Sequence, residues 1–116
     1  MEVVRDLGIT GSTSILRLTG PLTLATIGTL QKVLQEIGSV DTVIDLSHVP
    51  LIDSAGLSAI LEHWAGTQRT SHKFALTGTS PRIDLLLEIT KVNTMLPIFK
   101  TAEEADCSFA GKAAGA

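Results

Sequence analysis

The chain has 116 residues, a net charge of −3 and a hydrophobic fraction of 44%, which fits one globular domain and excludes a disordered chain. Only four residues are Phe or Trp, none is Tyr, and the nine basic residues are scattered, so the aromatic platforms and basic patches of nucleic-acid and membrane-surface binders are missing. With no signal peptide, no apolar stretch of the roughly 20 residues that span a membrane, and a single cysteine that cannot form an internal disulfide, we expect a cytoplasmic protein without membrane insertion.

The first part of the chain predicts a strand hairpin followed by a helix. Residues 3–10 and 14–19 have the composition of two strands, joined by a Gly-Ser-Thr turn. Apolar residues then recur every three or four positions over residues 24–37, which predicts an amphipathic helix. Thr23 is its expected N-cap and Gly38 its expected C-cap.

A second strand and helix follow. Residues 41–46 are almost continuously apolar, which predicts a central strand. It leads to a helix over about residues 54–69, whose apolar stripe is Leu57, Ile60, Leu61 and Trp64. Asp53 and Ser54 lie at the start of this helix, where either side chain can accept a hydrogen bond from a free N–H group. The partial positive charge there can also hold a phosphate.

The rest of the chain predicts further alternation. A strand at residues 73–77 precedes a third helix with Ser80 as N-cap and Pro81 as its first residue. A short edge strand at residues 97–99 precedes a last helix capped by Thr101.

These elements give the order β-β-α-β-α-β-α-β-α, which indicates an α/β fold with a small mixed sheet. We expect one domain over residues 1–109 and a disordered tail of small residues at 110–116.

Catalytic and cofactor motifs are missing around Ser54. The sequence Ile52-Asp53-Ser54-Ala55-Gly56 is not the G-x-S-x-G motif of hydrolases. Nothing in the sequence places His48, His63 or His72 beside Ser54. No pair of residues has metal-ligand spacing, and no glycine-rich phosphate loop is present, so we expect no metal, no cofactor and no enzymatic activity. On these grounds alone, Ser54 is interpreted as a helix cap.

Residues 43–57 resemble the signature of the STAS domain, specifically that of the bacterial anti-sigma-factor antagonists. In that signature an apolar strand ending in Asp-Leu-Ser, here Asp45-Leu46-Ser47, leads to Asp-Ser-x-Gly-Leu, which begins here at Asp53. The resemblance extends over roughly residues 3–106 and includes Leu76-Thr77-Gly78. It implies the STAS fold, a mixed sheet of about five strands with helices mainly on one face.

The resemblance also implies a function. An antagonist binds a kinase-type anti-sigma factor, which then releases its sigma factor; the kinase inactivates the antagonist by phosphorylating the motif serine, here Ser54, and a PP2C-type phosphatase restores it. Such antagonists are monomers or weak dimers. The residues expected at the partner interface are Leu22, Thr23, Leu24, Asp53, Ala55, Gly56 and Leu57.

A second interpretation follows from one departure from the family pattern. Antagonists commonly carry Gly-Glu-x-Asp before the first helix, whereas this chain has Gly20-Pro21-Leu22-Thr23, which lacks both negative charges. The alternative is therefore a STAS subunit that does not switch, in a stress-signalling or lipid-transport ATPase complex.

Overall fold

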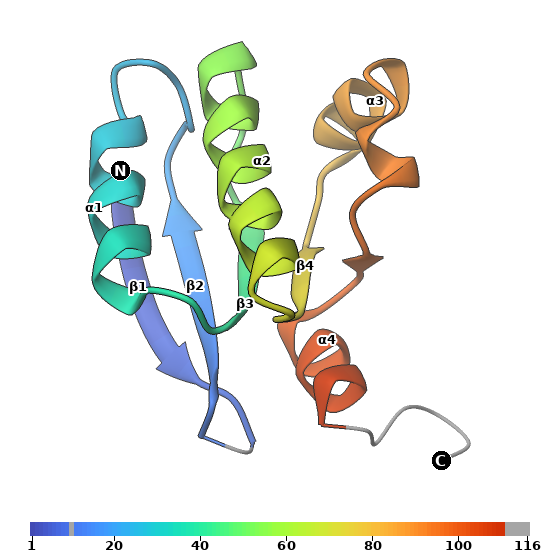
Figure 1. Ribbon diagram of the computed structural model, residues 1–116. Coiled ribbons are helices and arrows are strands. Elements are labelled where there is room, and N and C mark those ends of the chain that lie inside the picture. The colour runs from blue at the N-terminus through green and yellow to red at the C-terminus, as the bar shows by residue number, and fades with distance from the viewer. Residues whose placement is uncertain (10, 111–116) are drawn as a thin grey trace.

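The computed structural model describes residues 1–9 and 11–110, and within them it has the predicted order of elements (Figure 1). The elements are β1 (Glu2–Leu7), β2 (Thr13–Thr19), α1 (Ile27–Ile37), β3 (Asp41–His48), α2 (Ser54–Arg69), β4 (Phe74–Thr77), α3 (Pro81–Ile89), the 3₁₀ helix η1 (Val92–Thr94), β5 (Ile98–Phe99) and α4 (Ala102–Phe109). Of the predicted tail, only Ala110 belongs to the described residues; the others lie outside them. No helix in the described ranges has the length and apolar character needed to cross a membrane.

The strands form one sheet in the order β1-β2-β3-β4-β5. The hairpin strands β1 and β2 are antiparallel, and every other neighbouring pair is parallel. The predicted central strand is confirmed as β3, and the predicted edge strand is confirmed as β5.

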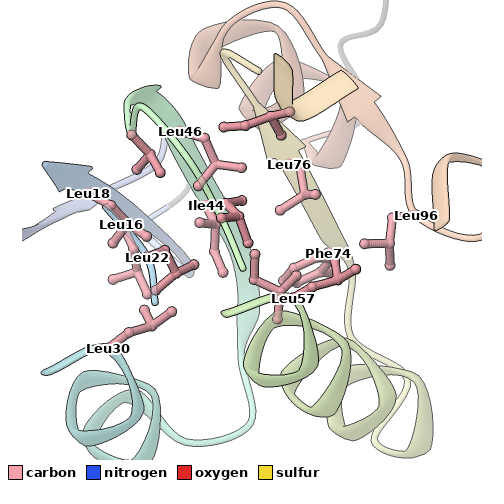
Figure 2. Close-up of a cluster of buried hydrophobic side chains, with 14 of the residues drawn as sticks. Leu16, Leu18, Leu22, Leu30, Ile44, Leu46, Leu57, Phe74, Leu76 and Leu96 are labelled. Carbon is pink, nitrogen blue, oxygen red and sulfur yellow. The ribbon is translucent and has the colours of Figure 1, made fainter. Parts of the chain in front are cut away.

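Alternate residues of the strands face two separate layers of helices. Leu16, Ile44 and Leu76 are in register across β2, β3 and β4, and they are fully buried in a cluster with the apolar side chains of α1, α2 and α3 (Figure 2). The neighbouring register row, Ile15, Val43 and Ala75, packs in a second, smaller cluster with two alanines of α4. Three of the four helices therefore cover one face of the sheet, and α4 covers part of the other.

The start of the first helix differs from the prediction. Helix α1 begins at Ile27, three residues later than expected, and its N-cap is Thr26 instead of Thr23. The Thr26 hydroxyl accepts a hydrogen bond from the N–H group of Thr23 and donates to the carbonyl oxygen of Pro21. These bonds hold the segment before Ile27 as a loop, in which Leu24 is 74% exposed. Gly38 is confirmed as the C-cap, since its N–H group bonds to the carbonyl oxygen of Leu34.

The motifs Asp45-Leu46-Ser47 and Leu76-Thr77-Gly78 pack directly against each other. The buried Asp45 carboxylate accepts hydrogen bonds from the hydroxyl groups of Ser47 and Thr77. Gly78 lies against this group with a φ of +67°, and a Cβ atom at this position would collide with Asp45 and Ser47. A glycine is therefore required by both the backbone conformation and the lack of space.

We expect Gly78→Ala to lower the free energy of unfolding by about 2–4 kcal/mol, because it adds a collision to the strain of a left-handed backbone. Gly11→Ala is the matched control, since Gly11 has a φ of +76° with open space around its Cβ position. The control should lower the free energy of unfolding by only about 1–2 kcal/mol, because backbone strain is then the whole effect. Urea denaturation of both variants measures the difference, and equal losses would contradict the role given to the Asp45–Ser47 contact.

Candidate functional site

Asp53 caps helix α2 and also holds a neighbouring loop. Its Oδ1 atom accepts a 2.9 Å hydrogen bond from the N–H group of Gly56, within the first turn of the helix. Its Oδ2 atom accepts a 3.0 Å hydrogen bond from the N–H group of Leu24, in the loop between β2 and α1. One carboxylate therefore gives a free N–H group of the first helical turn its hydrogen bond, and it also fixes the position of the loop beside the helix.

Backbone hydrogen bonds join the same two segments. The N–H group of Asp53 donates to the carbonyl oxygen of Leu22 (3.1 Å), and the N–H group of Leu22 donates to that of Leu51 (3.0 Å). Leu22 and Ile52 form a parallel β-bridge. The Leu22 side chain is buried in the main core cluster (Figure 2). The loop is thus attached to the start of α2 by its backbone and to the core by one side chain.

Gly56 allows this close approach. A Cβ atom on Gly56 would collide with the carbonyl oxygen of Leu22 and would contact the side chain of Ile52. The glycine of the Asp-Ser-x-Gly motif therefore has a structural reason, namely the contact between the first turn of α2 and the loop.

Ser54 is the first helical residue of α2, and its side chain is exposed. The interpretation of Ser54 as the cap is wrong, because Asp53 occupies that position and makes the capping hydrogen bond. Among the described residues, no hydrogen-bond partner holds the Ser54 hydroxyl group. It is therefore open to a partner protein.

The residues predicted for the site differ in their exposure. The buried ones are Leu22, Gly56 and Leu57. The half-buried ones are Thr23, Asp53 and Ala55. The exposed ones are Leu24 and Ser54. The buried group holds the site in shape, and the remaining residues form the surface that a partner could contact.

The hydrogen bonds of Asp53 stabilise its ionised form. The N–H group of Gly56, followed by that of Leu24, lowers the pKa of the Asp53 carboxyl below its ordinary value. A carboxylate with a lowered pKa and with both oxygens occupied is a weak general base. Asp53 is thus suited to positioning and poorly suited to activating Ser54.

Two of the three histidines, His63 and His72, contact residues other than Ser54. His63 Nε2 lies 3.0 Å from the Thr42 hydroxyl oxygen, and burial lowers the pKa of His63. His72 Nδ1 lies 3.2 Å from the Asp41 carboxylate. In the part of the chain that the structure describes, no group of three His, Cys, Asp or Glu side chains could hold a metal ion.

A family model for the STAS domain matches residues 4–105. The chain belongs to the STAS domain family. The resemblance to the STAS domain is thereby confirmed, and the alternation of five strands and four helices is the STAS fold. A comparison with curated protein sequences gives no significant match.

Solved structures of several other proteins share this fold over nearly their whole length. An anti-sigma-factor antagonist (STAS) domain protein from Planctomyces limnophilus has 18% identity and a TM-score of 0.82, with 95% of this chain and 99% of that chain covered. A sulfate transporter family protein from Wolinella succinogenes has 20% identity and a TM-score of 0.77, with 92% and 90% covered. The Bacillus cell fate determinant SpoIIAA in its phosphorylated form has 16% identity and a TM-score of 0.68, with 90% and 96% covered.

Sequence reasoning missed one functional element of the site, the link between Asp53 and the loop. The Leu24 N–H group and the Asp53 carboxylate are 29 positions apart in the sequence, and no local pattern joins them. Nothing in the sequence indicated that the Thr26 hydroxyl forms hydrogen bonds within the loop. The sequence signal that was available for this loop is that Thr26 is a residue type that can begin a helix.

We expect the stability of this STAS domain to depend on the ionisation of Asp53. Because its pKa is lower in the folded chain than the ordinary value of about 3.9, its contribution is complete above that value and is lost as the pH falls through the lower, folded pKa. Asp53→Asn removes this titration, so its unfolding free energy should fall less steeply than that of the wild type between about pH 5 and about pH 2. Urea denaturation at several pH values measures both slopes, and parallel curves would contradict the assignment.

Proposed function

We propose that this STAS domain is an anti-sigma-factor antagonist that binds a kinase-type anti-sigma factor and is inactivated by phosphorylation of Ser54. The observation that carries the proposal is the exposed, unbonded hydroxyl group of Ser54 at the first position of α2. The fold shared with anti-sigma-factor antagonists supports it, among them SpoIIAA, which has been solved in both its unphosphorylated and its phosphorylated form. A PP2C-type phosphatase would reverse the modification, and release of a sigma factor in the cytoplasm would be the result.

The position of Ser54 suits a reversible charge switch. A phosphate adds about −1.5 to −2 charge at neutral pH. The N–H groups of a first helical turn favour negative charge, so the modified side chain needs no change of fold. The ionised Asp53 beside it adds to the local negative charge. A partner surface that fits a neutral hydroxyl group would then have to bury a dianion, which costs several kcal/mol when the charge is unpaired.

In this proposal the domain is a kinase substrate and a binding protein, and it is not a catalyst. Phosphoryl transfer needs a group that accepts or orients the hydroxyl proton. Asp53 is a poor candidate, since both of its oxygens accept backbone hydrogen bonds and its pKa is lowered. The base must therefore come from the kinase. The same arrangement argues against a hydrolase with Ser54 as nucleophile, and we expect no labelling by a fluorophosphonate.

The direct test is incubation with the kinase-type anti-sigma factor of the source organism and ATP, followed by peptide mass spectrometry. We expect one phosphate on Ser54 and none on the variant Ser54→Ala. Ser58 provides a matched control, because it is exposed on the same helix one turn further on. Ser58→Ala should be phosphorylated like the wild type.

Two results would contradict the proposal. One is the absence of phosphate on Ser54 under conditions in which the kinase modifies another antagonist. The other is modification of Ser54→Ala to the same extent as the wild type, which would place the phosphate elsewhere.

A STAS subunit that does not switch is the second candidate function. The structural likeness to a sulfate transporter family protein supports it, as does the lack of acidic residues between Gly20 and Thr23. It predicts that Ser54 stays unmodified and that the chain co-purifies with a transporter ATPase or a signalling scaffold. The mass spectra of the kinase test show whether Ser54 is modified, and a pull-down with the tagged chain identifies the co-purifying partner.

A further inference from the structure

Leu24 is the most exposed of the large hydrophobic side chains in the described ranges, at 74%. Placing so much apolar surface in water is unfavourable, by roughly 25 cal/mol for each Å². A single exposed leucine needs no explanation by itself. Its position and its attachment in the structure are what distinguish Leu24 from the others.

The backbone that carries Leu24 is held on both sides. The Leu24 N–H group bonds to Asp53 Oδ2 at 3.0 Å. Before it, the Thr23 N–H group bonds to the Thr26 hydroxyl at 2.9 Å. After it, the N–H group of Thr26 bonds back to the carbonyl oxygen of Thr23 at 2.9 Å. Little backbone entropy remains to be lost when a partner covers this side chain, which is the condition for a strong contact.

The two chain segments that carry Leu24 and Ser54 contain very little charge. No Asp, Glu, Lys or Arg occurs from Gly20 to Leu30, and Asp53 is the only one from Leu46 to Leu61. Both carboxylate oxygens of Asp53 accept backbone hydrogen bonds. The neighbouring cation is Arg82 of α3, which lines a groove of about 240 Å³ together with Leu51 and Ile52.

We propose that Leu24 is a preorganised apolar anchor that inserts into an apolar pocket of the partner protein, and that this contact sets partner specificity at the Ser54 site. The inference rests on the proposed function. It adds that the partner contacts this loop through apolar surface, with no basic patch needed to match it. Anchors of this kind carry a large share of binding energy when a rim of weaker contacts excludes water around them.

A surface with few charges also makes the phosphorylation switch more effective. Salt screens exposed charge pairs over a distance of about 8 Å at physiological ionic strength, whereas a buried charge is screened much less. If apolar contact excludes water around Leu24, a phosphate on Ser54 is desolvated without a counter-charge. The anchor thereby connects affinity in the unmodified state with rejection of the modified state.

The test is calorimetric binding of the kinase-type anti-sigma factor to the wild type and to three variants. We expect Leu24→Ala to weaken binding by about tenfold or more, as for a central apolar contact. Leu24→Met should stay within about threefold, because it keeps volume and apolar character. Leu7→Ala is the matched control and should bind like the wild type, since Leu7 is a 63% exposed leucine of β1 that pairs with Ser14, at the end of the hairpin remote from Gly20. Thermal unfolding checks that each variant is folded.

Salt dependence provides a second measure. Wild-type affinity should change by less than about threefold between about 50 mM and about 300 mM NaCl, because few charges take part. A Leu24→Ala variant that binds within about twofold of the wild type would overturn the anchor and leave the proposed function standing. A wild-type chain that does not bind the anti-sigma factor would overturn both.

Discussion

The hydrogen bonds of the Asp53 carboxylate determine the geometry on which the rest of the site depends. One oxygen caps α2 and the other holds the N–H group of Leu24, so the start of the helix and the loop between β2 and α1 keep a fixed separation. The buried side chain of Leu22 and the missing Cβ of Gly56 make this contact close. Leu24 and Ser54 consequently lie in two segments that the Asp53 carboxylate joins, and a modification of one segment can affect how a partner meets the other.

The sheet places apolar side chains on the face that packs with α1, α2 and α3, and charged side chains on the opposite face. Because neighbouring residues of a strand point to opposite faces, Leu16, Ile44 and Leu76 pack with α1, α2 and α3, while Arg17 and Asp45 lie on the side of α4. Arg17 pairs there with Asp45 at 3.2 Å and with Glu103 of α4 at the same distance. These pairs are partly exposed and contribute little to stability by themselves. Arg17, Asp45 and Glu103 are thereby paired on the face remote from α1 and α2.

Most of the fold was predictable from the sequence, because local patterns and the final packing agree. Ser80, Pro81 and Thr101 take the positions at helix starts that their chemistry favours. The start of α1 was not predictable, since Leu24 fits the apolar spacing of that helix, while hydrogen bonds of the Thr26 hydroxyl and of Asp53, distant in the sequence, hold it in a loop. For the site, the sequence located Ser54 correctly at the start of α2. It could not distinguish the buried Leu22, Gly56 and Leu57 from the surface residues, because that depends on how the loop meets the helix.

The central claim is that a charge on Ser54 controls partner binding. The most direct measurement is the dissociation constant of one kinase-type anti-sigma factor for the unmodified chain and for the chain phosphorylated on Ser54, under the same buffer conditions. We expect phosphorylation to weaken binding by about a hundredfold or more, since burial of an unpaired dianion costs several kcal/mol and each 1.4 kcal/mol is a factor of ten. Equal dissociation constants for the two forms would contradict it.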